Sequence, residues 1–122
     1  MITSVKLMGV CVSDQDRALD FYTNKLGFEV RANEPMGPDM RWIEVAPPGS
    51  QSALALFTPP GLENRIGTFS QIVFKCDDIQ ATYQELVQRG VTFTEPPKDQ
   101  PGGGGVMATF VDPDGNAFVL GS

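Results

Sequence analysis

Hydrophobic and polar positions follow the same order twice along the chain. In the first half, the alternating apolar run at 5–12 is typical of a β-strand. It ends at Ser13-Asp14, a pair that can accept hydrogen bonds from the free amides at a helix N-terminus. Apolar residues then recur at helical spacing over 18–26, and Gly27 is suited to end that helix. The pattern predicts a strand, a helix and the start of a second strand at 28–31.

The second half repeats this order. A strand is predicted at 69–76, Asp77-Asp78 is the expected cap, and a helix follows from Ile79 to Val87. Gly90 ends the helix and a further strand begins at 91–93. The interval from capping aspartate to glycine is one residue shorter than in the first half, so we expect a helix about one residue shorter.

Two more strands are predicted in each half, at 41–46 and 53–58 and at 106–111 and 116–120. Each pair is separated by a turn sequence, Pro-Pro-Gly-Ser at 47–50 or Asp-Pro-Asp-Gly at 112–115. Around the second turn, Asp112 and Asn116 are expected to bond to the local backbone. Each half therefore reads β-α-β-β-β, which makes the fold class α+β. Because a half of this size buries too little apolar surface alone, we expect one domain built from module one (1–58), a linker (59–67) and module two (68–122).

Composition and charge restrict the classes of molecule that are expected as partners. The 122 residues carry a net charge of −6, and lysine and arginine form no cluster. This argues against nucleic acid and membrane as partners, because both are bound through clustered cations. No apolar run approaches the length of a membrane span, the N-terminus lacks the pattern of a secretory signal, and Cys11 and Cys76 lie outside any paired-cysteine motif. We therefore expect a cytoplasmic protein.

Three segments carry a family resemblance: DQDRALDFY at 14–22 with Leu-Gly-Phe at 26–28, Asp-Asp-Ile at 77–79 with Gly-Val at 90–91, and FVDPDGN at 110–116. In their order and spacing the chain resembles the vicinal-oxygen-chelate superfamily, which includes glyoxalases, bleomycin-resistance proteins and extradiol dioxygenases. The resemblance implies a curved eight-stranded sheet that forms a cup, with helices on the convex side and a ligand in the hollow. It also implies a homodimer.

Metal-dependent members of that superfamily take one ligand from each of four strands, usually two histidines and two glutamates. The resemblance places these positions at Leu7, Ala55, Gln71 and Val119. The chain has no histidine, three of the positions are hydrocarbon, and an amide oxygen is a poor ligand for zinc, nickel or iron. We therefore expect no metal and no other cofactor, while a nonstandard site of Glu44, Asp112 and Gln71 stays open.

Strand alternation divides each strand into a core face and a face toward the hollow. The side chains expected to contact a ligand are Leu7, Trp42, Glu44, Ala55, Phe57, Gln71, Val73 and Val119. Apolar walls with a few polar groups are typical of sites for small organic molecules. Trp42, the single tryptophan, is either a stacking surface for a ligand or a packing or dimer-contact residue.

Three functions fit this pattern. The first is metal-free binding of a small organic molecule, as in drug-sequestering members of the superfamily. The second is a small lyase-, isomerase- or oxygenase-type enzyme acting on an oxygenated substrate, with Glu44 or Lys75 as candidates for proton transfer or with the nonstandard metal site. The third is an interaction module whose hollow is filled by its own side chains. No catalytic residue is assigned beyond these two candidates.

Overall fold

The computed structural model describes residues 1–122, which divide into two compact units, 1–67 and 68–122. The elements of the first unit are β1 (Leu7–Val10), α1 (Gln15–Asp20) with a π-helical continuation (Phe21–Lys25), β2 (Glu29–Pro35), β3 (Arg41–Ala46), β4 (Ala53–Leu56) and a 3-10 turn (Glu63–Arg65). Those of the second are β5 (Phe69–Lys75), α2 (Ile79–Gln88), β6 (Thr92–Asp99), a 3-10 turn (Pro101–Gly103), β7 (Val106–Val111) and β8 (Ala117–Gly121). No helix is both long and apolar enough to cross a membrane.

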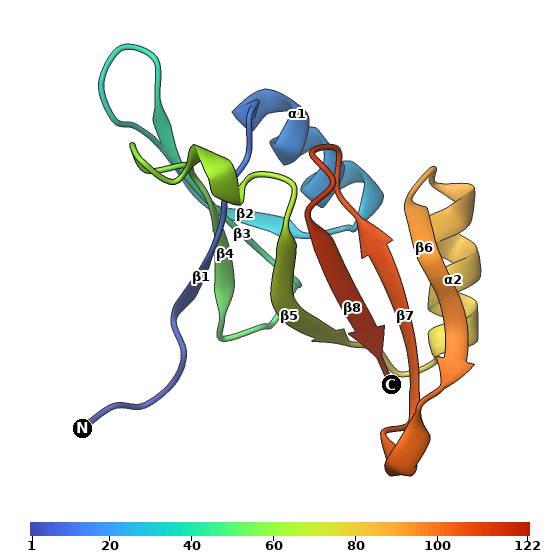
Figure 1. Cartoon of the computed structure of the whole chain (residues 1–122). Helices are drawn as coiled ribbons and strands as arrows, with labels where there is room; N and C mark the ends of the chain where they lie inside the picture. Colours follow the sequence, from blue (N-terminus) through green and yellow to red (C-terminus); the bar gives the residue numbers. More distant parts are fainter. The chain divides into compact units, whose positions relative to one another are not determined.

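The eight predicted strands form two four-stranded sheets, one in each unit (Figure 1). The strand orders, β1-β4-β3-β2 and β5-β8-β7-β6, are equivalent. In each sheet the first strand pairs in parallel with the fourth, and the other pairs are antiparallel. The predicted α+β class with two β-α-β-β-β modules is confirmed.

Both helices begin where the sequence places their caps. The Asp14 carboxylate accepts the Arg17 amide at 3.0 Å, and the Asp78 carboxylate accepts the Ala81 amide at 3.1 Å. Gly27 and Gly90 follow in the left-handed region, with φ of 78° and 89°. The second helical segment is one residue shorter than the first, as predicted.

The π-helical end of the first helix was not predicted. There the Leu26 amide donates to the Phe21 carbonyl at 3.1 Å, five residues back. The Thr23 hydroxyl donates to the Leu19 carbonyl at 2.7 Å, where it competes with the regular backbone pattern.

Strand lengths differ from the predictions mainly at the sheet edges. β1 is shorter than the predicted 5–12, because its parallel partner β4 offers only four residues. β2 and β6 extend several residues beyond the short strand starts predicted for them. Both are edge strands with mostly exposed residues, so they lack the apolar alternation that marks a half-buried strand.

The edge strands β2 and β6 carry features that disfavour further pairing. β2 ends in Pro35, and β6 contains Pro96 and Pro97. The ladder of β2 is interrupted between Val30 and Ala32, and that of β6 is interrupted twice. Proline lacks the amide that a ladder needs, and a bulge twists the strand, so neither edge is a regular template for another strand.

Each sheet has a buried core face. In module one, Ile43, Val45 and Leu56 are fully buried on the sheet and Tyr22 is fully buried on the helical segment. In module two, the Phe118 ring lies 5.3 Å from that of Phe74 and 5.6 Å from that of Phe110, in near-parallel stacks. Tyr83 of α2 packs edge-on against Phe93 of β6 at 4.7 Å.

The turn between β7 and β8 is held by a buried carboxylate. Asp112 is 4% exposed and Asn116 3% exposed. One carboxylate oxygen of Asp112 accepts the backbone amides of Asp114 and Asn116 at 3.0 and 2.9 Å, and the other accepts the Asn116 side-chain amide at 2.9 Å. The prediction that these two residues form the turn is confirmed.

Candidate functional site

The open face of the first sheet, opposite its core face, carries an aromatic pair with a carboxylate beside it. Trp42 and Glu44 are two residues apart on β3, so they share this face. The indole N–H of Trp42 donates to Glu44 Oε2 at 2.7 Å. The rings of Trp42 and Phe57 lie 5.6 Å apart at 53°. All three residues are half-buried, so each keeps surface that a ligand can reach.

Small residues lie next to this group. Glu44 is opposite Ala55 in the register, and Ala55 is opposite Gly9 of β1. A Cβ built on Gly9 would meet no atom within 4 Å, so the surface above it is open. Leu7, two residues before Gly9 on β1, lies opposite Ala53 of β4. Ala55 itself is 5% exposed and forms part of the floor.

The carboxylate of Glu44 retains binding capacity. Oε2 is engaged by the indole, whereas Oε1 has no partner within the chain. A carboxylate oxygen accepts hydrogen bonds only, so this atom suits an N–H, an O–H or a cationic group of a ligand.

The second sheet presents the equivalent face with different chemistry. Val73 lies opposite Val119, which lies opposite Thr109. Val73 is 57% exposed and Val119 is half-buried. Lys75, at the end of β5, is exposed. The threonine occupies the position that Glu44 holds in module one, so module two has no carboxylate there.

Gln71 lies on β5 between two register positions. The pairing of β5 with β8 passes from Phe69 to Val73 with a shift, and Gln71 has a φ of 63°. Its side chain is exposed. Sequence alternation placed Gln71 toward the hollow, but it gave no sign of the bulge.

The four positions at which the family resemblance places metal ligands do not fit a metal in this chain. Leu7, Ala55 and Val119 have no donor atom, and Gln71 supplies one neutral amide. No group of three or more histidine, cysteine, aspartate or glutamate side chains is placed to hold an ion. Of the nonstandard site left open above, Glu44 belongs to module one and Gln71 and Asp112 to module two, where the Asp112 carboxylate is engaged by its own turn. That site stays a prediction.

A groove of about 1120 Å³ in module one was not predicted. Its lining comes from within 12–16, 35–41 and 58–66, segments that are far apart in sequence and that join strands at one end of the sheet. Proline, glycine and aspartate in these segments signal loops, but nothing in the sequence shows that the loops meet.

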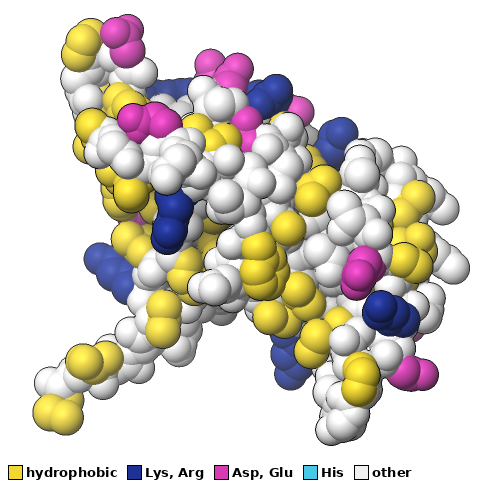
Figure 2. Space-filling model, viewed as in Figure 1, with side chains coloured by type: hydrophobic (Ala, Val, Ile, Leu, Met, Phe, Trp, Pro, Cys, Tyr) yellow, Lys and Arg dark blue, Asp and Glu magenta, His cyan; other side chains and the backbone are white.

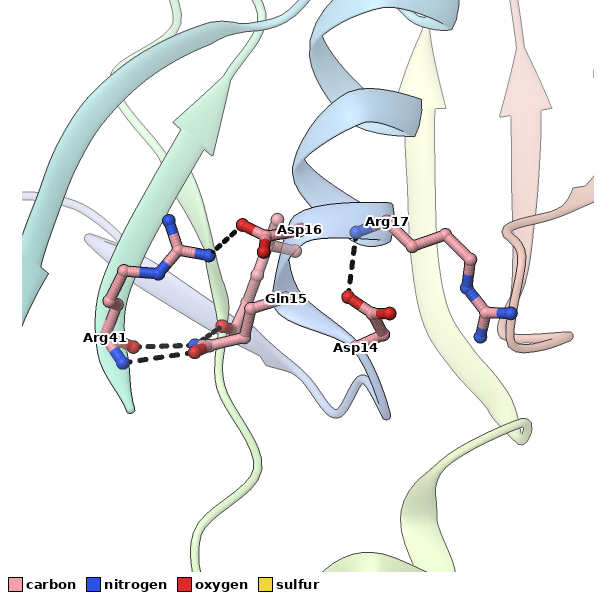
Figure 3. A network of polar contacts seen from close by, with 6 residues as sticks. Asp14, Gln15, Asp16, Arg17 and Arg41 are labelled. Carbon is pink, nitrogen blue, oxygen red and sulfur yellow. Dashed lines mark hydrogen bonds and ion pairs between the residues drawn. The ribbon is translucent and has the colours of Figure 1, made fainter. Parts of the chain in front are cut away.

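Gln15 fixes one wall of this groove (Figure 3). Its amide nitrogen donates to the carbonyls of Arg41 and Leu56 at 2.6 and 2.9 Å, and its amide oxygen accepts the Arg41 amide at 3.1 Å. The Arg41 guanidinium forms an ion pair with Asp16. Because one side chain ties the start of the helix to β3 and β4, the first turn of α1 is held against the sheet.

The structure thus brings the module-one candidates Trp42, Glu44, Ala55 and Phe57 together on one face, with Leu7 on the neighbouring strand. Of the module-two candidates, Val73 and Val119 are register partners in their own sheet, and Gln71 lies in the irregular part of β5. The two candidates for proton transfer, Glu44 and Lys75, belong to different modules.

Comparison with known proteins agrees with this fold. The chain is 38% identical over 120 residues to the protein YetH of Bacillus subtilis, with 98% of each chain covered. A superfamily member from Sphaerobacter thermophilus has a similar structure, with 42% identity, a TM-score of 0.89 and coverage of 98% of this chain and 97% of that one. TnmS3, an antibiotic binding protein from Streptomyces sp. CB03234, is 38% identical with a TM-score of 0.86, and the match covers 98% of this chain and 95% of TnmS3.

A family model also matches residues 4–120, nearly the whole chain. Together with the two equivalent modules and the relatives that share them, this match identifies the family. The chain belongs to the Glyoxalase/Bleomycin resistance protein/Dioxygenase superfamily.

Proposed function

We propose that this protein binds a small aromatic organic molecule, of the kind represented by antibiotics, against the open face around Trp42, and that it does so without a metal. The observation that carries the proposal is the half-buried Trp42–Phe57 pair beside a carboxylate with one unengaged oxygen. The antibiotic-binding relative TnmS3, similar over nearly its whole length, supports the same class of ligand.

The Trp42 indole is the main source of binding free energy in this proposal. A large aromatic surface contributes strongly to binding because it removes much apolar area from water and stacks on another ring. The hydrogen bond to Glu44 holds the indole in one orientation, so less side-chain freedom is lost when a ligand binds. Gly9 and Ala55 are small residues on the neighbouring strands, so they leave space beside the indole ring.

The charge of Glu44 sets a preference among ligands. Its unengaged oxygen can pair with a cationic or N–H group, and the net charge of −6 attracts cations over longer range. We therefore expect cationic aromatic compounds to bind more tightly than anionic ones of similar size.

The test is a titration of Trp42 emission with bleomycin and with a panel of cationic, neutral and anionic aromatic antibiotics. Trp42 is the only tryptophan, so any saturable change in emission reports on this face. We expect at least one compound to bind, and calorimetry on Trp42→Ala should then show an affinity at least about tenfold lower, which is about 1.4 kcal/mol.

The matched control is Val30→Ala. Val30 is an exposed apolar residue on β2, and its register partner Val45 belongs to the core face. The Val30→Ala variant should bind the ligand with the same affinity as the parent protein. A panel that leaves Trp42 emission unchanged, or a Trp42→Ala variant that binds as tightly as the parent, would count against the proposal.

We further propose that the protein works in the cytoplasm as a homodimer. Neither Cys11 nor Cys76 forms a disulfide, as expected in a reducing compartment. Several large apolar side chains are exposed on the single chain, including Val5, Phe69 and Val73, and a subunit interface would cover such residues. Sedimentation equilibrium should give twice the 13.2 kDa mass of one chain, whereas a single-chain mass at micromolar concentration would contradict the dimer.

A further inference from the structure

The side-chain amide of Gln15 joins the two strands that carry the aromatic pair. Its nitrogen donates to the Arg41 carbonyl of β3 at 2.6 Å and to the Leu56 carbonyl of β4 at 2.9 Å (Figure 3). Its oxygen accepts the Arg41 amide at 3.1 Å. Each of these strand residues directly precedes a ring of the pair, Trp42 on β3 and Phe57 at the end of β4. The same amide therefore contacts the backbone one residue before each ring.

Gln15 bridges β3 and β4 beyond the end of their regular pairing. The register pairs Val45 with Leu54 and Glu44 with Ala55, and it stops before the aromatic pair. Beyond that point the amide nitrogen lies between the strands, because it donates to a carbonyl on each. A side-chain amide has donors and an acceptor, as a peptide group does, so it can take the place of direct ladder bonds.

The other side of β4 is fixed without Gln15. The Phe57 amide donates to the Val10 carbonyl of β1 at 3.3 Å. The Thr58 hydroxyl donates to the Val12 carbonyl at 2.8 Å and accepts the Val12 amide at 2.9 Å. These bonds hold the end of β4 against β1 and the residues after it. At this end of the sheet the Gln15 amide holds β3 against β4.

The spacing of the two rings thus depends on a side chain from the start of α1. The rings of Trp42 and Phe57 lie 5.6 Å apart at 53°, so they are tilted against each other and not stacked flat. Both stay half-buried in this arrangement. A surface that has one geometry before binding loses less conformational freedom when a ligand binds.

We propose that Gln15 is a positioning residue, which sets the distance between Trp42 and Phe57 by bridging their strands and so prepares the aromatic surface for its ligand. Its hydrogen bonds go to strand backbone, so it acts through the two rings. The inference rests on the proposed function, because it explains how that face is held ready for binding.

The experiment compares the parent protein with Gln15→Met and Asp14→Ala. Methionine keeps the length of the side chain and removes every hydrogen bond of the amide. Asp14→Ala removes the cap of the same helix, whose carboxylate accepts the Arg17 amide, so it controls for a loosened helix start. All measurements are made at a temperature at which far-UV circular dichroism shows the three proteins to be folded.

The first measurement needs no ligand, because Trp42 is the only tryptophan. In Gln15→Met we expect the indole band in near-UV circular dichroism to lose most of its intensity, and acrylamide quenching of Trp42 emission to rise about twofold. A role in stability alone would lower the unfolding temperature and leave these signals of the folded protein unchanged, as we expect for Asp14→Ala.

The second measurement is calorimetry with 9-aminoacridine, a cationic aromatic probe. Its affinity should fall about tenfold in Gln15→Met and stay within about twofold of the parent in Asp14→Ala. Hydrophobic side chains are also grouped over β5 of the second unit, where an aromatic probe can adsorb (Figure 2). Binding to Trp42→Ala measures this background, which is subtracted.

A second substitution covers the case in which Gln15→Met does not fold. Gln15→Glu keeps the size of the side chain and an oxygen that accepts the Arg41 amide, but its carboxylate cannot donate to the two carbonyls. It should change the Trp42 signals and the affinity in the same direction.

Parent-like Trp42 signals in the folded Gln15 variant, or equal changes in Asp14→Ala, would overturn the positioning role. A Gln15 variant that binds 9-aminoacridine as tightly as the parent would overturn it as well. A parent that does not bind the probe would count against the proposed function, and the Trp42 spectra alone would then decide whether Gln15 positions the rings.

Discussion

Phe118→Ala should destabilise the protein by about 3–5 kcal/mol, the range for truncating a large buried aromatic side chain. Phe118 is fully buried and contacts both Phe74 and Phe110, whose rings also lie 6.2 Å from each other, so the alanine would leave a cavity beside two rings that are fixed by other contacts. A shift of the urea midpoint, followed by far-UV circular dichroism because Trp42 lies in the other module, would measure the loss.

The control for this variant is Val87→Ala. Val87 is an apolar residue of α2 that is 46% exposed, so its truncation should change the free energy of unfolding by less than about 0.5 kcal/mol. If Phe118→Ala were as stable as Val87→Ala, the aromatic stack would not be the core of module two.

Asp112→Ala should cost about 3 kcal/mol of stability. The substitution removes a carboxylate that accepts three hydrogen bonds, and it leaves the buried side-chain amide of Asn116 without that acceptor. The loss should appear in the same urea unfolding experiment. Asp77→Ala, which removes an exposed carboxylate next to the cap of α2, should be nearly neutral. A neutral Asp112→Ala would show that the turn is held by its backbone alone.

The sequence predicts best those strands whose two faces differ most. The predicted bounds of β3 and β7 match the structure, because fully buried residues such as Ile43 and Phe110 alternate with half-buried ones. The helix caps follow equally from local chemistry, since a capping aspartate contacts an amide only three residues away.

Features that depend on a partner strand are not encoded locally. The length of β1 is set by β4, and β2 and β6 are longer than their patterns indicate because ladder bonds, not apolar alternation, define them. The bulge at Gln71 was missed because bulges are usually signalled by glycine, which is absent there.

The candidate site also combines features that the sequence predicts with features that it does not. Strand alternation correctly predicts that Trp42 and Glu44 share one face. It does not predict the hydrogen bond between them, which depends on side-chain rotamers. The contact between Trp42 and Phe57 joins β3 to the end of β4 and follows from strand pairing. The groove near Gln15 is built by three distant loops, so no local pattern predicts it.

The prolines and bulges of β2 and β6 bear on how much of this protein a cell can hold. Under the proposed function the protein binds its compound without consuming it, so it must accumulate to the concentration of that compound. Regular open strand edges would then be templates for amyloid-like addition of further chains. With Pro35 in β2 and Pro96 and Pro97 in β6, those two edges should resist such growth at high abundance.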